Sequence, residues 1–155
     1  MASTDAADVV ARGRAIVDSN LYMVLGTADE DGRPWAAPVY FAPDGYRDLY
    51  WVSTPEAKHS RNIERRREIS VVIFDSSVPI GGAQAVYMSA LAQEVSGDER
   101  ENGIGVFSRR SIAHGAAEWT LRDVEAPAPL RLYRATAVDQ FVLGAGDRRI
   151  PVTLS

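Results

Sequence analysis

The residues best suited to chemistry lie between positions 51 and 62, where a predicted strand gives way to a predicted helix. Ser53 and Thr54 supply hydroxyl groups at the end of the strand. Lys58 and His59 supply hydrogen-bond donors or positive charge shortly afterwards. The start of a helix also presents backbone N–H groups without partners and the positive end of the helix dipole. Together these groups predict a site for an anion, above all for a phosphate group.

The same segment also fits an ordinary capped helix. Thr54, Pro55 and Glu56 are typical of a helix start, with a hydroxyl at the N-cap, proline at the first helical position and an acid next. In this interpretation the helix runs to about Arg67 and its basic residues face solvent. The pattern alone does not separate the two interpretations.

The other residues that could do chemistry form weaker patterns. His114 lies in a predicted loop, which favours a surface or hinge position over a catalytic base. Trp35, Trp51 and Trp119 are typical of core or interface packing. The chain has no cysteine, no Gly-x-Ser-x-Gly nucleophile motif and no His-Glu-x-x-His metal motif. We therefore expect no metal site, and the pattern assigns no catalytic residue.

The elements that position these residues are mostly strands. Residues 4–18 predict a helix that Thr4 caps. Strands are predicted at 21–28, 33–42 and 48–53, separated by turns that contain glycine. Because short turns can join only antiparallel neighbours, these three strands predict an antiparallel meander.

The second half of the chain continues in the same way. The run ISVVIF at 69–74 is apolar at every position but one and predicts a strand buried on both faces. We expect a mainly β fold, a six-stranded antiparallel barrel with flanking short helices, because closure removes exposed sheet edges. A two-sheet sandwich is the structural alternative. The other predicted elements are strands at 84–95, 130–143 and 150–154 and helices at 98–110 and around 118–122.

Length and charge narrow the classes of function. The 155 residues fit one domain spanning 1–155. The net charge of −4 argues against a nucleic-acid partner. No apolar run approaches the roughly 20 residues of a membrane helix, so we expect no membrane partner. The acidic N-terminus shows no signal-peptide pattern, and the lack of cysteine is compatible with the reducing cytoplasm, where we expect the protein.

Four segments follow one another in a recognisable order: LGTADEDGRPWAAPVYF, DLYWVST, AKHSRNI and ISVVIF. This order resembles the pyridoxamine 5′-phosphate oxidase-like family, the FMN-binding split β-barrels. The likeness extends over roughly residues 15–95, and a weaker similarity is found in the segment RLYRATAVDQFVL. The resemblance implies a split barrel, FMN as cofactor and a homodimer with the cofactor cleft between its subunits.

The resemblance also implies roles for residues after the aromatic strand. Ser53 and Thr54 fall where the family ends this strand against the flavin phosphate and ribityl chain. Lys58 and His59 fall on the basic pair that grips the phosphate, and Ser60 belongs to the same cofactor-binding stretch. The family commonly has lysine at the position of His59, so phosphate binding here would depend on pH near neutrality.

Further cofactor contacts are implied on two other strands. The stretch Pro38, Val39 and Tyr40 matches the backbone that lies beside the isoalloxazine ring. Gln84 is similar in position to a glutamine that reaches the cofactor from the second subunit. Tyr87 would line the same cleft.

The function implied by this resemblance is that of an FMN-dependent oxidoreductase acting on a small-molecule substrate. We do not expect a true pyridoxamine phosphate oxidase, because the C-terminal part lacks the arginine–histidine substrate pattern of those enzymes. One alternative is a deazaflavin (F420) reductase, with Arg61, Arg65 and Arg66 as contacts for the acidic tail of F420. Another is a non-enzymatic flavin- or haem-binding module. A plain interaction barrel with an empty cleft is the last alternative.

Overall fold

The computed structural model describes residues 5–155, and they begin with helix α1 (Ala6–Ser19). The Asp5 carboxylate caps this helix by accepting a hydrogen bond from the Ala7 N–H at 3.2 Å. The predicted helix is confirmed, whereas its predicted cap, Thr4, lies outside the described residues. The apolar face of α1 is buried against the sheet.

The remaining elements match most of the predicted ones to within one or two residues. The helix predicted around 118–122 is a 3₁₀ turn at Leu121–Asp123. The strands are β1 (Tyr22–Ala28), β2 (Pro34–Tyr40), β3 (Ala42–Asp44), β4 (Asp48–Ser53), β5 (Glu68–Phe74), β6 (Ala85–Glu94), β7 (Arg131–Leu143) and β8 (Arg149–Val152). The other helices are α2 (Lys58–Arg65) and α3 (Glu99–Ala113), and a second 3₁₀ turn is at Ala145–Asp147.

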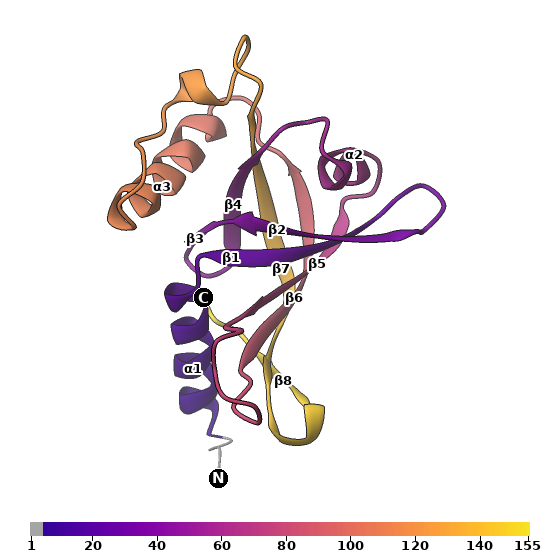
Figure 1. Cartoon of the computed structure of the whole chain (residues 1–155), viewed down its shortest axis with the longest axis vertical. Helices are drawn as coiled ribbons and strands as arrows, with labels where there is room; N and C mark the ends of the chain where they lie inside the picture. Colours follow the sequence, from indigo (N-terminus) through magenta and orange to yellow (C-terminus); the bar gives the residue numbers. More distant parts are fainter. Residues whose placement is uncertain (1–4) are drawn as a thin grey trace.

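All strand pairs are antiparallel and belong to one sheet, in the order β2-β1-β5-β6-β7-β4-β3, with β8 paired to β7. The sheet curls round its core until β2 and β4 come into contact without forming a ladder (Figure 1). This architecture is a split β-barrel, so the predicted fold class is confirmed. Residues 5–155 form eight strands rather than six: β8, of four residues, is the short extension predicted at 150–154, and β3, of three residues, is an added strand.

The predicted three-strand meander is wrong. Within residues 5–155, β2 pairs with β1 alone, whereas β4 pairs with β3 and β7. After Tyr40 the chain crosses to the opposite end of the sheet order and starts a new hairpin. Gly45 and Tyr46 adopt positive φ in the turn of this hairpin. The short link between β2 and β3 therefore spans the split of the barrel and leaves one edge of β2 unpaired.

Two groups of buried apolar side chains stabilise the fold. The larger group fills the curl of the sheet and includes Phe41 and Trp51, which are fully buried. The smaller group lies under α3 and includes Tyr50 and Phe107. β5 buries alternate residues and leaves Phe74 46% exposed. The prediction that this strand is buried on both faces is therefore wrong, because no element of the described chain covers the outer face.

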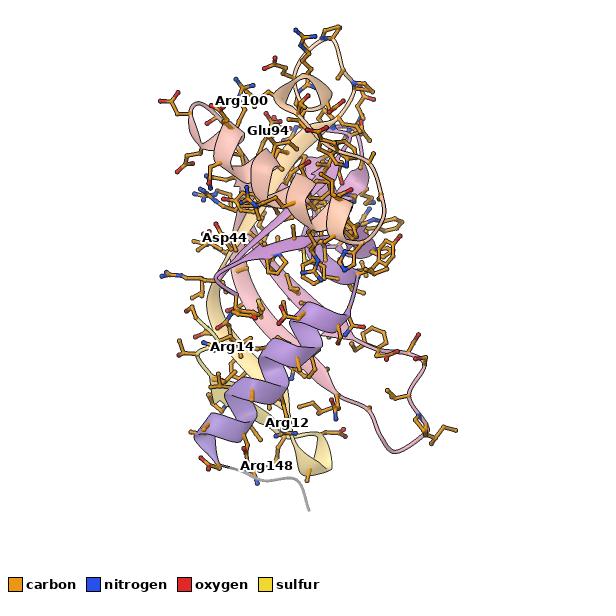
Figure 2. The ribbon with its side chains drawn as sticks, turned by 90° about the vertical axis from the view of Figure 1, so that its left-hand side faces the viewer. Arg12, Arg14, Asp44, Glu94, Arg100 and Arg148 are labelled. Carbon is orange, nitrogen blue, oxygen red and sulfur yellow. The ribbon has the colours of Figure 1, made fainter. Side chains whose placement is uncertain are left out.

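Helix α3 contacts β3, β4 and β7, and Figure 2 shows α3 above α1, with both helices toward the viewer. Gly103 is the point of close approach, since a Cβ there would lie 2.7 Å from Tyr50 Cε1 and 2.8 Å from Leu132 Cδ2. Near the end of α3, Arg110 donates hydrogen bonds to backbone carbonyls at and just after the end of α1, including that of Asn20 at 2.8 Å.

No helix among residues 5–155 is long and apolar enough to span a membrane.

Candidate functional site

The junction between β4 and α2 differs from the predicted helix start. Helix α2 begins at Lys58, after a turn at residues 55–57. The Thr54 carbonyl accepts hydrogen bonds from the Ala57 N–H at 3.2 Å and from the buried Ser60 hydroxyl at 2.8 Å, which stabilises this turn. A threonine–proline–glutamate sequence suits a turn as well as a cap. The N-cap is therefore an alanine, and no side chain caps the first N–H groups of α2.

Ser53 and His59 are joined across this turn. The buried Ser53 hydroxyl lies 3.0 Å from Nε2 of His59, whose ring is half-buried. Burial lowers the pKa of His59 below its usual 6.5, so the imidazole is neutral at pH 7. A neutral imidazole that accepts the serine proton at Nε2 carries its own proton on Nδ1. In that tautomer the pair offers a neutral N–H donor at the start of α2.

Lys58 is the exposed cation at this helix start. Its ammonium lies 5.1 Å from the centre of the Trp35 ring, a cation–π contact that keeps the charge beside the first turn of α2. Trp51 and Trp119 pack in the buried clusters, as their residue type predicts. Trp35 is 45% exposed, so its place beside Lys58 is a feature that the sequence pattern did not reveal.

A hollow of about 420 Å³ opens beside Lys58 and carries charges of both signs. Arg65, on the far side of the hollow, pairs with Glu30 at 2.8 Å. Lys58 and Arg61 form no ion pair within residues 5–155 and could meet an anionic ligand. The lining residues are Asp29, Glu30, Glu56, Lys58, Arg61, Asn62 and Arg65.

Asn62 anchors α2 to the sheet, a role that the sequence pattern did not reveal. Its amide nitrogen donates a hydrogen bond to the Thr27 hydroxyl at 3.0 Å, and both side chains are buried. This contact holds α2 against β1 and so positions Lys58 and His59 relative to the end of β4.

The residues predicted beside a cofactor ring lie along β2 and alternate in orientation. Val39 is buried in the core, Pro38 is exposed, and Tyr40 is half-buried. The Tyr40 hydroxyl lies 2.8 Å from Nδ1 of His114, which the structure places at the C-cap of α3 rather than in a loop. One edge of β2 has no strand partner within residues 5–155. Its N–H and C=O groups can form hydrogen bonds with a planar ligand.

Gln84 and Tyr87 lie at the other end of the sheet from Lys58. Gln84 is exposed just before β6, and the Tyr87 ring lies 4.4 Å from the Arg149 guanidinium. The opposite end of β6, at Glu94, shares a hollow with residues of α2. A strand of ten residues spans about 30 Å, so a single chain does not bring Gln84 to Lys58.

Comparison with known proteins identifies relatives of this arrangement. The family model described as pyridoxamine 5′-phosphate oxidase matches residues 10–140, which include the whole β4–α2 junction. A search of curated proteins finds no significant match.

Solved structures share the fold at low sequence identity. A haem-binding protein from Mycobacterium smegmatis superimposes with a TM-score of 0.74 at 18% identity, covering 93% of this chain and 57% of that protein. HutZ, the haem storage protein from Vibrio cholerae, gives a TM-score of 0.66 at 19% identity, covering 83% and 90% of the two chains. A protein of the pyridoxinephosphate oxidase family from Clostridium acetobutylicum gives 0.65 at 10% identity, covering 94% of each chain. At these identities the likeness concerns the fold alone.

Proposed function

Because the chain belongs to the pyridoxamine 5′-phosphate oxidase family, we propose that it binds FMN and acts as a flavin-dependent oxidoreductase on a small molecule. The flavin supplies the redox chemistry when bound, while the protein holds the phosphate, supports the ring and shapes the cleft. The observation that carries this proposal is the uncapped start of α2 beside Lys58 and the Ser53–His59 pair.

The β4–α2 junction offers positive charge and hydrogen-bond donors that suit a phosphate group. The free amides of the first helical turn favour an anion, and Lys58 adds an exposed ammonium. Each charge-assisted hydrogen bond contributes about 1.5–3 kcal/mol net. Asp29 and Glu56 line the same hollow and oppose a dianion. We therefore expect phosphate affinity to depend strongly on Lys58.

The free edge of β2 suits the polar rim of an isoalloxazine ring. Main-chain groups of residues 38–40 would form hydrogen bonds with the ring. The Tyr40 side chain is bonded to His114, so the contact with the ring belongs to the backbone of this stretch.

We propose that two copies of the chain complete the cleft. Phe74 and Leu91, which lie on the same face of β5 and β6, are 46% and 40% exposed. Large apolar side chains gathered on one uncovered sheet face are typical of an interaction surface. Gln84 and Tyr87 are remote from Lys58 of their own chain, so a cofactor contact by these residues requires a second copy.

Replacement of Lys58 and His59 together by alanine tests the phosphate site. We expect the Kd for FMN to rise at least about tenfold, since two interactions of the phosphate are lost. The control is Arg66→Ala, an exposed cation at the C-cap of α2, which should change the Kd less than about twofold. Quenching of FMN fluorescence on titration gives the affinities, and far-UV circular dichroism checks the fold.

Two results would count against this proposal. Unchanged FMN affinity in the double variant would remove both residues from the site. Absence of FMN binding by the unmodified chain would overturn the flavin proposal as a whole.

Haem binding is the second candidate function, and the solved neighbours favour it. The proteins from M. smegmatis and V. cholerae bind or store haem and share this split barrel. The absorption spectrum of the purified protein separates the candidates, because FMN, a deazaflavin and haem have different bands. A Soret band without flavin bands would favour the haem candidate.

A further inference from the structure

Few side chains of this protein could ligate the iron of a haem. The chain has no cysteine and two histidines, His59 and His114. Among its methionines, Met23 and Met88 are 0% and 2% exposed and lie inside the core. No group of three or more acidic, cysteine or histidine side chains within residues 5–155 could hold a bare metal ion. An imidazole ligand for haem would therefore come from one of the two histidines.

The ring of His114 is held in an orientation that suits a metal ligand. It lies at the C-cap of α3, is exposed to solvent, and has its Nδ1 atom 2.8 Å from the Tyr40 hydroxyl. Within residues 5–155, Nε2 of His114 has no hydrogen-bond partner. Metal-binding histidines almost always use the second ring nitrogen to bond a neighbouring group, which fixes the tautomer and the ring orientation. Tyr40 can hold His114 in this way, with Nε2 free for iron.

Tyr40 is itself held firmly. Its ring makes edge-to-face contacts with Phe107 at 5.5 Å, with His114 at 6.0 Å and with Tyr22 at 6.2 Å. Phe107 lies on the buried face of α3. This stack therefore connects the exposed histidine to the smaller group of buried apolar side chains. The orientation of His114 is therefore fixed by packing as well as by the hydrogen bond.

The surroundings of His114 combine exposed apolar side chains with one cation, the Arg110 guanidinium, which interacts with the Tyr40 hydroxyl. Leu21 and Tyr22 at the start of β1 are 42% and 60% exposed, and Ile112 in the last turn of α3 is 53% exposed. Arg110 joins this turn of α3 to the backbone carbonyl of Asn20, which brings the two segments together. A flat apolar macrocycle would find both a nitrogen ligand and apolar contacts here.

His59 is a poorer ligand. Its Nε2 atom is already bonded to the Ser53 hydroxyl, and its ring is half-buried. It also belongs to the junction that suits a phosphate group. Ligation of iron by His59 would break a buried hydrogen bond and leave the Ser53 hydroxyl without this partner.

We propose that Nε2 of His114 is the axial ligand of an iron porphyrin, with Tyr40 as the residue that positions its ring. This proposal rests on the haem candidate of the preceding section. It commits that function to the junction of β1, β2 and α3, a site separate from the phosphate junction at α2.

Hemin titration followed by the Soret band tests the proposal. The unmodified chain should give a saturable Soret shift. His114→Gln should weaken hemin binding at least about tenfold, and Tyr40→Phe, which removes the positioning contact, should weaken it about tenfold with an altered spectrum. His59→Gln is the matched control and should leave both affinity and spectrum unchanged.

Two further measurements make the outcome decisive. Added imidazole should restore the histidine-type spectrum of a His114→Gly variant, which a merely structural role for His114 would not produce. The FMN affinity of His114→Gln should equal that of the unmodified chain, and its circular dichroism should show an intact fold. A spectrum lost in His59→Gln but retained in His114→Gln would overturn the ligand assignment alone. The absence of any Soret shift in the unmodified chain would overturn the haem candidate together with it.

Discussion

His59 lies beside Ser53 at the end of β4, and the burial of its ring decides which form of the imidazole the folded chain favours. The ring is half-buried, and burial disfavours its protonated form. In the unfolded chain the same ring is fully hydrated. The difference links the stability of the fold to pH.

We expect the free energy of unfolding to fall as the pH drops below 6.5, because the unfolded chain then binds a proton at His59 that the folded chain does not. This contribution is fully present above pH 6.5 and is lost as the pH approaches the lower pKa of the folded state. Urea unfolding at pH 7.5 and pH 5.5 measures the effect. His59→Gln should show a smaller loss between these two pH values, and an equal loss in both proteins would contradict the assignment.

The sequence predicted contacts between neighbours in the chain better than contacts between separate elements. Ser53 and His59 are close in the chain, so the strand–turn–helix pattern was enough to place them together. The contact of Lys58 with Trp35 joins two separate elements, and the bond between Tyr40 and His114 joins residues 74 positions apart. Such contacts depend on how α2 and α3 pack on the sheet, which local periodicity does not contain.

At the scale of elements, the positions of most helices and strands could be predicted from the spacing of the hydrophobic residues and from the turn residues. The start of α2 did not, because threonine followed by proline fits a cap and a turn equally well, and the Ser60 hydroxyl favours the turn. The pairing of the strands did not follow either. Short turns imply antiparallel neighbours, but the link after Tyr40 crosses the split of the barrel instead.

The packing of α3 depends on Gly103, and a substitution there tests it. Gly103→Ala should lower the free energy of unfolding by about 1–3 kcal/mol, because the new methyl group would press on Tyr50 and Leu132. Gly105→Ala is the matched control: its Cβ would come no closer than 3.4 Å to Arg109, and better helix propensity should add up to about 1 kcal/mol. Urea unfolding of the two variants should therefore give opposite signs. A gain in both would show that α3 does not pack tightly at Gly103.

At the scale of the whole molecule, the uncovered outer face of the sheet predicts self-association. Phe74→Glu would place a charge in the proposed interface, where burial of an unpaired charge is unfavourable. We expect sedimentation to show a dimer for the unmodified chain and a monomer for this variant. Val138→Glu is the control, since Val138 is 64% exposed but lines a groove beside α1, and it should leave the dimer intact. A dimer that survives Phe74→Glu would place the interface elsewhere.

The register of β4 has a consequence for how the protein is made. The main partner of β4 is β7, and their ladder joins Leu49 to Ala135, late in the chain. During synthesis on a ribosome, the hairpin of β3 and β4 remains without this partner until β7 has been translated. Pairing across so long a separation is slow, and the waiting hairpin exposes unpaired strand edges. The barrel therefore closes only after β7 has been translated, and chaperones that shield nascent strands would act in that interval.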